Sequence, residues 1–315
     1  MTRDLVQIVA GARIGRTRDV ARLLSLIEDG NPSVAALLAE TAGDTPSARI
    51  VGITGSPGVG KSTLTSALVG VLRARGERVG VLAIDPSSPF SGGALLGDRI
   101  RMHEHATDEG VFIRSMASRG RLGGLAAAVP QAIRALDVAG FTTILLETVG
   151  VGQSEIDVAA AADTCLVLLA PGMGDGIQAA KAGILEVADI LVVNKADRDG
   201  VEATVREVRS MIALSGSGAD AWTSPVLSTV ATTGDGIDVL CDAISDHERW
   251  LAVSGEGEAR RLRRSRDEIE ALALAALRSR LETGTGRERL DHLAREVLEG
   301  TTDAYAAAAA LVDGL

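Results

Sequence analysis

The residues with the clearest chemical purpose lie in one glycine-rich segment. It reads Gly55-Ser-Pro-Gly-Val-Gly-Lys61-Ser62-Thr63 and matches the pattern G-x-x-x-x-G-K-[ST]. Glycines let a backbone approach a polyphosphate and turn its N–H groups inward, and the positive end of a following helix faces the negative charge. Lys61 would reach the β- and γ-phosphates, and the Ser62 hydroxyl would ligate Mg²⁺. The predicted phosphate-binding loop consists of Gly55, Ser56, Pro57, Gly58, Val59, Gly60, Lys61, Ser62 and Thr63.

Carboxylates that end apolar runs, or stand in polar segments after them, are candidates to hold the cation. Asp85 closes an apolar run, Asp98 lies in a glycine- and serine-rich segment, and Glu147 ends a run of Ile and Leu. A hard cation takes oxygen ligands directly or through water, and a buried carboxylate needs such a partner. For Asp85 alone, a turn or helix-cap aspartate before proline is the alternative. The predicted metal ligands are Ser62, Asp85, Asp98 and Glu147, and the predicted catalytic residues are Lys61, Asp98 and Glu147.

The segment after Glu147 carries a second set of candidates. Gly150 follows three residues later, where a backbone N–H can sense the γ-phosphate in phosphate-loop enzymes. Ordinary small GTPases carry Asp where this chain has Glu147, so we expect a distinct subclass. Gln153 could orient a water molecule, although its spacing from the glycine differs from that of small GTPases.

The segment Asn194-Lys195-Ala-Asp197 predicts the choice of base. A carboxylate only accepts hydrogen bonds, and guanine offers two donors, N1–H and the 2-amino group, on one edge. Adenine would leave the carboxylate unpaired, a mismatch worth roughly 10⁴-fold in a site built to hydrogen-bond its ligand. We therefore predict GTP rather than ATP. The expected base-contacting residues are Asn194, Lys195 and Asp197, with a second loop at Val230, Ala231 and Thr232 whose backbone N–H would face guanine O6.

Apolar runs that alternate with helical stretches are expected to position these motifs. Such alternation builds a mostly parallel sheet with helices on both faces and a ligand site at the carboxyl ends of the strands. The glycine-rich segment follows the first run and precedes a helical stretch. This setting favours a phosphate-binding loop over the alternative, a glycine-rich turn with a chance lysine. We predict an α/β phosphate-loop NTPase domain over residues 46–252. Its strands are expected at 49–54, 79–85, 110–116, 142–148, 164–170, 189–195 and 225–231.

Helical extensions are expected on both sides of this domain. Residues 1–45 carry apolar residues at three- and four-residue spacing and predict an N-terminal helical arm. Residues 253–315 carry three short amphipathic stripes, which bury little by themselves and must pack on the main domain or on another subunit. The basic run 260–266 continues into acidic residues, so we interpret it as a solvated or intersubunit face rather than a nucleic-acid patch.

Composition limits the environment and the partners. Of the 315 residues 46% are apolar and only 2% aromatic, so the core must be built from Val, Ile, Leu and Ala. The net charge of −10 argues against nucleic acid or an anionic membrane as a partner. The two cysteines lack metal-site spacing and predict reduced, packed thiols. With no signal peptide and no long apolar span, we expect a cytoplasmic, soluble protein.

With these residues in place, the chain resembles the MeaB/ArgK family, GTPases that act as chaperones for adenosylcobalamin-dependent methylmalonyl-CoA mutase and its relatives. The resemblance covers nearly the whole chain, including Asp85-Pro-Ser-Ser-Pro and Gly97-Asp98-Arg-Ile-Arg-Met, and is most specific at Glu147-Thr-Val-Gly-Val-Gly-Gln-Ser-Glu155. It implies GTP/GDP and Mg²⁺ as ligands in the roles given above. It also implies a homodimer joined through helical arms, and a mobile segment, 174–181, that communicates with the mutase through Lys181.

The leading hypothesis is Mg²⁺-dependent GTP hydrolysis that gates cofactor loading in a B12 enzyme. One rival is a kinase that serves amino-acid transport, an older label of this family, although the guanine signature argues against ATP. A second is a nickel-type metallochaperone, which would usually carry a His-rich or Cys/His cluster, whereas the four histidines here are scattered. A third is a binding module with an inactive nucleotide site, which the intact carboxylates disfavour.

Overall fold

The computed structural model describes residues 3–31, 34, 47–86, 103–105, 107–118, 124–148, 154–172, 187–215, 221–282 and 284–314. The chain divides into two compact units, Met1–Arg264 and Ser265–Leu315. The functional division predicted from the sequence, with arms at 1–45 and 253–315, stays a prediction.

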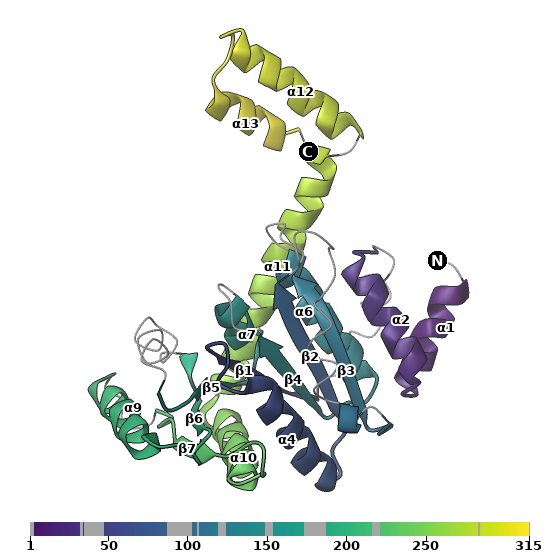
Figure 1. Cartoon of the computed structure of the whole chain (residues 1–315). Coiled ribbons are helices and arrows are strands. Elements are labelled where there is room, and N and C mark those ends of the chain that lie inside the picture. Colours follow the sequence, from purple (N-terminus) through teal and green to yellow (C-terminus); the bar gives the residue numbers. More distant parts are fainter. Residues whose placement is uncertain are drawn as a thin grey trace. The chain divides into compact units, whose positions relative to one another are not determined.

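A parallel sheet forms the centre of the first unit (Figure 1). Its seven strands lie in the order β3-β2-β4-β1-β5-β6-β7, and every neighbouring pair is parallel. The order reverses at β1, which lies between β4 and β5, so the crevice for a ligand is expected beyond its carboxyl end. Each apolar run predicted as a strand overlaps one of these strands, and the bounds agree to within two residues. The strands are β1 (Arg49–Gly55), β2 (Val79–Pro86), β3 (Val111–Ser118), β4 (Thr143–Thr148), β5 (Thr164–Leu169), β6 (Ile190–Asn194) and β7 (Val226–Thr229).

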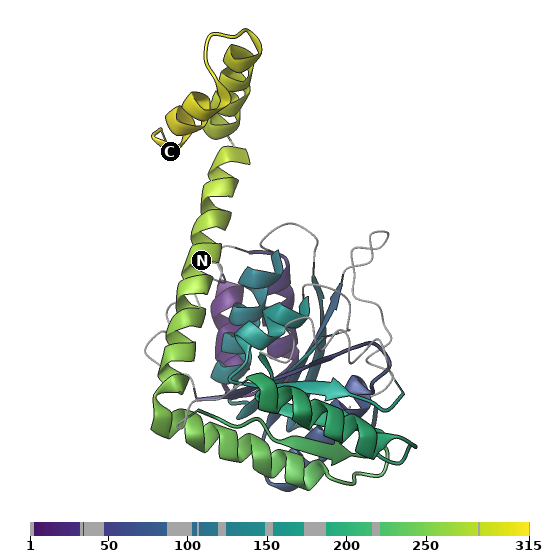
Figure 2. The same ribbon diagram turned by 90° about the vertical axis from the view of Figure 1, so that its left-hand side faces the viewer.

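Helices cover both faces of the sheet (Figures 1 and 2). Alternate side chains of a strand point to opposite faces, so a strand of apolar residues has an apolar surface on each face. In β4, Ile144 and Leu146 join one hydrophobic core and Leu145 joins the other. The predicted α/β fold with helices on both faces is thereby confirmed. The first core is covered by α1 (Arg3–Arg13), α2 (Thr17–Glu28), α6 (Gly124–Val138) and α7 (Ser154–Ala161). The second is covered by α4 (Lys61–Ala74) and α10 (Ile237–Ser254), and α9 (Val201–Ser215) packs on β6 and β7.

The two N-terminal helices share a core with the sheet. The apolar stripe of α2 is buried in the same cluster as Phe112 of β3 and Leu136 of α6. At the other side of α2, Glu28 pairs with Arg114 of β3, whose guanidinium also donates to Ser25 Oγ at 3.1 Å. The helices α1 and α2 are therefore a layer of the first unit.

A buried carboxylate holds the start of α11 (Glu256–Glu282) on the sheet. Asp189, directly before β6, accepts two hydrogen bonds of 2.8 Å from Arg260, and its Oδ1 lies 3.3 Å from His247 Nε2. Burial opposes ionisation of Asp189, but the nearby His247 ring and the hydrogen bonds from Arg260 outweigh it and lower the pKa of the carboxyl. Arg264 likewise donates to Asp163 at 2.5 Å. For Arg260 and Arg264, the prediction of a solvated or intersubunit face was therefore wrong.

The second unit contains the rest of α11, α12 (Gly284–Leu298) and α13 (Ala304–Val312). Asp303 caps α13 by accepting hydrogen bonds from the N–H groups of Tyr305 and Ala306 at 2.8 and 3.0 Å. Most of its large apolar side chains are exposed, as expected for three helices with little core of their own. Across the described part of the chain, no helix combines the length and apolar character that a bilayer crossing requires.

Candidate nucleotide site

Three glycines shape the loop that joins β1 to α4. Gly55, Gly58 and Gly60 have φ angles of 140°, 80° and 97°, in the region that L residues rarely adopt. A Cβ on Gly55 would lie 2.4 Å from the Leu168 carbonyl oxygen, and a Cβ on Gly60 would lie 2.6 Å from Asn194 Nδ2. At these two positions both the backbone angle and the available space require glycine. The predicted phosphate loop therefore has the backbone that its sequence pattern implies.

Lys61 is the first residue of α4, and its ammonium group lies over this loop. The residue is only 7% exposed, and Nζ donates to the carbonyl oxygens of Gly55 at 2.6 Å and Ser56 at 3.2 Å. A buried ammonium ion needs acceptors, and these carbonyls supply them. The cation is thus held above the loop whose glycines can face a phosphate.

Ser62 and Glu147 meet beside the loop. Ser62 Oγ donates to Glu147 Oε1 at 2.6 Å, and both residues are buried. Strand alternation places Glu147 on the same face of the sheet as Leu145, which α4 covers, and β4 pairs with β1 so that Glu147 lies opposite Ile53. Two hard oxygen donors in a buried position next to a phosphate loop fit the ligand preference of Mg²⁺.

The other predicted metal and catalytic residues are only partly described. Asp85 lies near the end of β2, and its backbone is opposite Ala117 of β3. Two residues earlier in β2, Ala83 is opposite Glu147 of β4. Its backbone therefore lies at the same edge of the sheet as Glu147. Among the described residues, no group of three His, Cys, Asp or Glu side chains is placed to hold a metal ion. Asp98, Gly150, Gln153 and Lys181 lie outside the described residues.

The first two residues of the guanine signature are tied to the phosphate loop. Asn194, only 2% exposed at the end of β6, donates from Nδ2 to the Val59 carbonyl at 2.9 Å. Lys195 has a φ of 58° and donates from Nζ to the Gly58 carbonyl at 2.6 Å. The left-handed backbone at Lys195 is unusual for a residue with a side chain. Asp197 follows two residues later and is exposed, so its carboxylate is accessible to a ligand.

Asn194 also connects the phosphate loop to the predicted second base loop after β7. Its Oδ1 accepts hydrogen bonds from Thr229 Oγ1 at 3.1 Å and from the Ala231 N–H at 3.2 Å. The Val230 N–H donates to the Asp235 carbonyl at 3.0 Å. Of the three backbone donors predicted there, only that of Thr232 makes no hydrogen bond to another described residue, and Thr232 is exposed. We expect Thr232 to supply the N–H that faces a base.

A cavity of about 660 Å³ opens between α4 and this second base loop. Thr63 and Ser66 of α4 line one side, and the loop from Ala231 to Gly234 lines the other. Its outer wall includes His105, whose Nε2 lies 3.0 Å from the Ser66 carbonyl oxygen. The cavity thus begins at the last residue of the phosphate loop and at the loop predicted to contact the base.

Sequence reasoning did not single out Thr229, although it is 1% exposed and bonded to Asn194. In the sequence, Thr229 could have been noticed as a hydroxyl residue at the end of an apolar run.

The positions of the lysines show another pattern. The chain has only three, Lys61, Lys181 and Lys195, and the two in the described residues both bond to the phosphate loop.

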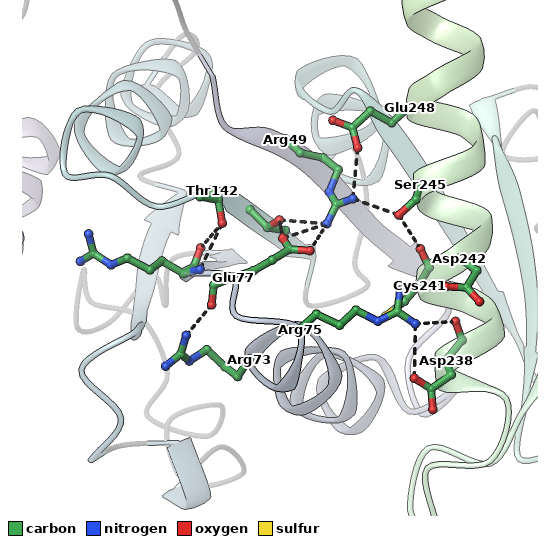
Figure 3. Close-up of polar contacts among 12 residues, drawn as sticks. Arg49, Arg73, Arg75, Glu77, Thr142, Asp238, Cys241, Asp242, Ser245 and Glu248 are labelled. Atoms are coloured by element: carbon green, nitrogen blue, oxygen red, sulfur yellow. Dashed lines mark hydrogen bonds and ion pairs between the residues drawn. The ribbon is translucent and has the colours of Figure 1, made fainter.

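A polar network fixes α4 against β1 and α10 (Figure 3). Arg49, the first residue of β1, donates to Glu77 at 2.9 Å and to Glu248 of α10 at 3.2 Å. Arg75, directly after α4, pairs with Asp242 of α10 at 2.8 Å. Because α4 begins in the phosphate loop and α10 begins directly after the second base loop, these contacts position both sides of the candidate site.

Comparisons with known proteins agree with this geometry. The family model described as "Methylmalonyl Co-A mutase-associated GTPase MeaB" matches residues 20–286. A Pyrococcus abyssi protein assigned as a GTPase is 44% identical over 304 residues, which is 96% of this chain and 94% of that protein. GTPase ArgK of Escherichia coli is 36% identical over 261 residues, covering 80% of this chain and 78% of ArgK. A crystal structure titled "LAO/AO transport system kinase" aligns with a TM-score of 0.71 and 26% identity, over 99% of this chain and 98% of that chain.

The family match covers most of the first unit and continues into the second. The two relatives carry the name GTPase and match at least 80% of this chain. The family resemblance predicted from the sequence is therefore confirmed. This chain belongs to the MeaB/ArgK family of guanine-nucleotide-binding, phosphate-loop GTPases.

Proposed function

We propose that this protein is a Mg²⁺-dependent GTPase of the cytoplasm that acts as a chaperone for an adenosylcobalamin-dependent enzyme. Its client would be methylmalonyl-CoA mutase or a relative, and hydrolysis would gate the loading or protection of the cofactor. The family description, a GTPase associated with that mutase, supports the choice of client. The hydrogen bonds of Asn194 are the observation that supports nucleotide binding most directly. They link the phosphate loop, the guanine signature and the second base loop.

The phosphate loop would bind the triphosphate through its backbone and Lys61. Bound phosphate oxygens would replace the carbonyls of Gly55 and Ser56 as acceptors for Lys61 Nζ, which already lies over the loop. The N–H groups at the start of α4 would face the same negative charge. Catalysis in such enzymes rests on positioning and electrostatic stabilisation of the γ-phosphoryl group, so this preformed arrangement is what the reaction requires.

Ser62 and Glu147 would hold Mg²⁺ or its water shell, with Asp85 and Asp98 as further candidates. When bound, Mg²⁺ neutralises charge on the β- and γ-phosphate oxygens. In this structure the Glu147 carboxylate accepts a hydrogen bond from the Ser62 hydroxyl, which orients the serine oxygen at the loop. The pair lies in a buried position, where a charge is costly unless it is matched by an opposite one.

Asp197 would select guanine by accepting hydrogen bonds from N1–H and the 2-amino group. The substitution Asp197→Asn should weaken GTP binding at least a hundredfold and strengthen XTP binding, because xanthine carries an acceptor where guanine carries the amino donor. Competition between GTP and XTP, measured by fluorescence displacement, tests this. Asp199→Asn is the matched control, since Asp199 is also exposed and stands two residues further along the same loop. An unchanged preference for GTP in Asp197→Asn would refute the base assignment.

The chaperone role needs a test with the client itself. Purified methylmalonyl-CoA mutase would be loaded with adenosylcobalamin in the presence of this protein and GTP, GDP or no nucleotide. We expect loading or protection of the cofactor to depend on GTP hydrolysis and to be lost in Lys61→Ala, which removes the cation over the phosphate loop. Equal loading with GTP, with GDP and with the variant would exclude gating by hydrolysis. The assignment of GTPase activity would not be affected.

A transport-linked protein kinase is the second candidate, because the aligned crystal structure is titled as one. The two functions differ in the fate of the γ-phosphoryl group, which appears as free phosphate in a GTPase and on a protein side chain in a kinase. Incubation with GTP labelled in the γ-phosphate, followed by separation of protein from free phosphate, distinguishes them. We expect the label as free phosphate. Label that appears on a protein in proportion to the GTP consumed would favour the kinase.

A further inference from the structure

A second cavity, of about 990 Å³, lies away from the candidate nucleotide site. It is formed by the connection from α1 to α2, the first two turns of α2, the last turn of α4, and the residues directly before β2 and β3, all within the first unit. The nucleotide residues stand at the carboxyl ends of the strands, whereas this cavity stands at the amino ends of β2 and β3. Its arginines are Arg16, Arg18, Arg22, Arg73 and Arg78.

Arg78 is held rigidly in the wall of this cavity. Its Nη1 donates to the carbonyl oxygens of Ala139 at 3.0 Å and Gly140 at 3.3 Å, and its guanidinium carbon lies 4.8 Å from the centre of the Phe141 ring. Within the described residues, Nε and Nη2 of Arg78 make no hydrogen bond. An arginine already fixed on one side loses little conformational entropy when a ligand occupies the other.

The remaining groups leave the cavity positively charged. Arg73 is neutralised, because it forms two hydrogen bonds with Asp108 at 2.8 and 2.9 Å. It donates a third, at 2.5 Å, to the Glu77 carbonyl (Figure 3). The two carboxylates in the lining are Asp19 and Glu109. Asp19 turns toward α1, where a Cβ on Gly11 would lie 1.9 Å from its Oδ2.

Apart from Arg73 and Arg22, the lining contains three arginines, Arg16, Arg18 and Arg78, and two carboxylates. The side chains of Arg16 and Arg18 are exposed, and neither guanidinium makes a hydrogen bond or ion pair to another described residue. This local excess of positive charge stands out in a chain of net charge −10. It would raise the local concentration of anions.

We propose that this cavity binds a small ligand that carries two or more phosphate groups, such as a phosphorylated metabolite or nucleotide. Guanidinium groups match phosphate oxygens with paired hydrogen bonds, and arginines from different elements around one concave space match several charges at once. The volume is in the range of small-molecule sites and far above that of one phosphate ion. A cavity, rather than a flat basic surface, favours a small molecule over an acidic protein segment.

Calorimetric titration with inorganic pyrophosphate tests the proposal. The protein would be saturated with GDP in the absence of divalent cations, so that the phosphate loop is occupied. We expect one equivalent to bind, and citrate, of similar charge but without phosphate, to bind at least tenfold more weakly. In the double variant Arg16→Glu/Arg18→Glu, the affinity for pyrophosphate should fall at least tenfold while GDP affinity stays unchanged.

Two controls separate this cavity from the nucleotide site and from general electrostatics. Lys61→Ala without GDP should still bind pyrophosphate, and loss of binding there would assign the probe to the phosphate loop and overturn the proposal. The double variant Arg206→Glu/Arg209→Glu makes the same charge change on exposed positions of α9 and should bind normally. Absence of binding to the wild type, equal binding of citrate, or an equal loss in both double variants would likewise overturn it.

Discussion

Replacement of Asn194 by alanine tests whether one buried amide organises the nucleotide site. The side chain makes three hydrogen bonds, to Val59, Thr229 and Ala231, and is 2% exposed. Each is worth about 0.5–1.5 kcal/mol net, so their loss amounts to about 3 kcal/mol. The Val59 carbonyl and the Ala231 N–H would also lose a partner. Where water does not replace it, the penalty for leaving a buried polar group unpaired adds to the loss.

Urea unfolding followed by tryptophan fluorescence measures this loss. The only two tryptophans, Trp222 and Trp250, both lie in the first unit, so the signal reports the unit that contains Asn194. We expect the free energy of unfolding to fall by about 3 kcal/mol in Asn194→Ala. The affinity for GDP should fall at least tenfold, because the phosphate loop and the second base loop lose their common anchor.

Thr229→Val supplies a graded comparison. Its hydroxyl donates only to Asn194, so this nearly isosteric change should cost about 1 kcal/mol. In the double variant the two losses should not add, because both remove the same hydrogen bond. A loss below about 1 kcal/mol in Asn194→Ala, or full additivity with Thr229→Val, would refute the reasoning.

Two further predictions concern the phosphate loop and Asp189. Gly60→Ala should lower GDP affinity more than tenfold in a binding titration, because its Cβ would lie 2.6 Å from Asn194 Nδ2. Gly76→Ala is the control. Gly76 has a similar φ of 84°, and a Cβ there would have nothing within 4 Å, so GDP affinity should stay unchanged. Asp189→Asn should lower the unfolding free energy by about 3 kcal/mol at neutral pH, because it leaves Arg260 without its carboxylate. The folded-state pKa of Asp189 lies below its unfolded value, so its stabilisation is present above the unfolded pKa and lost as pH falls through the folded pKa. The difference between wild type and variant should therefore shrink below about pH 4 in urea titrations, and a constant difference would contradict the assignment.

Much of the fold could be predicted from the sequence because strand and helix periodicities are local properties of the chain. Each predicted apolar run overlaps a strand, and the phosphate loop lies between β1 and α4 as its pattern implied. The glycine spacing, Lys61 and the order of the motifs indicated a GTPase, and the stretch 147–155 was the most specific sign of the family. The prediction failed for Arg260 and Arg264, because a local run of basic residues says nothing of carboxylates such as Asp189 that lie far away in sequence.

The candidate site depended on tertiary structure wherever two distant segments meet. Asn194 and Val59 are 135 residues apart, and Ser62 and Glu147 are 85 apart, so neither hydrogen bond follows from local pattern. The cavity around Arg78 likewise gathers residues from separate elements. The sequence by itself determined the motifs and the elements that carry them, since both are encoded over a few consecutive residues. The order of the strands in the sheet decided which motifs touch, because that order depends on how the whole chain packs.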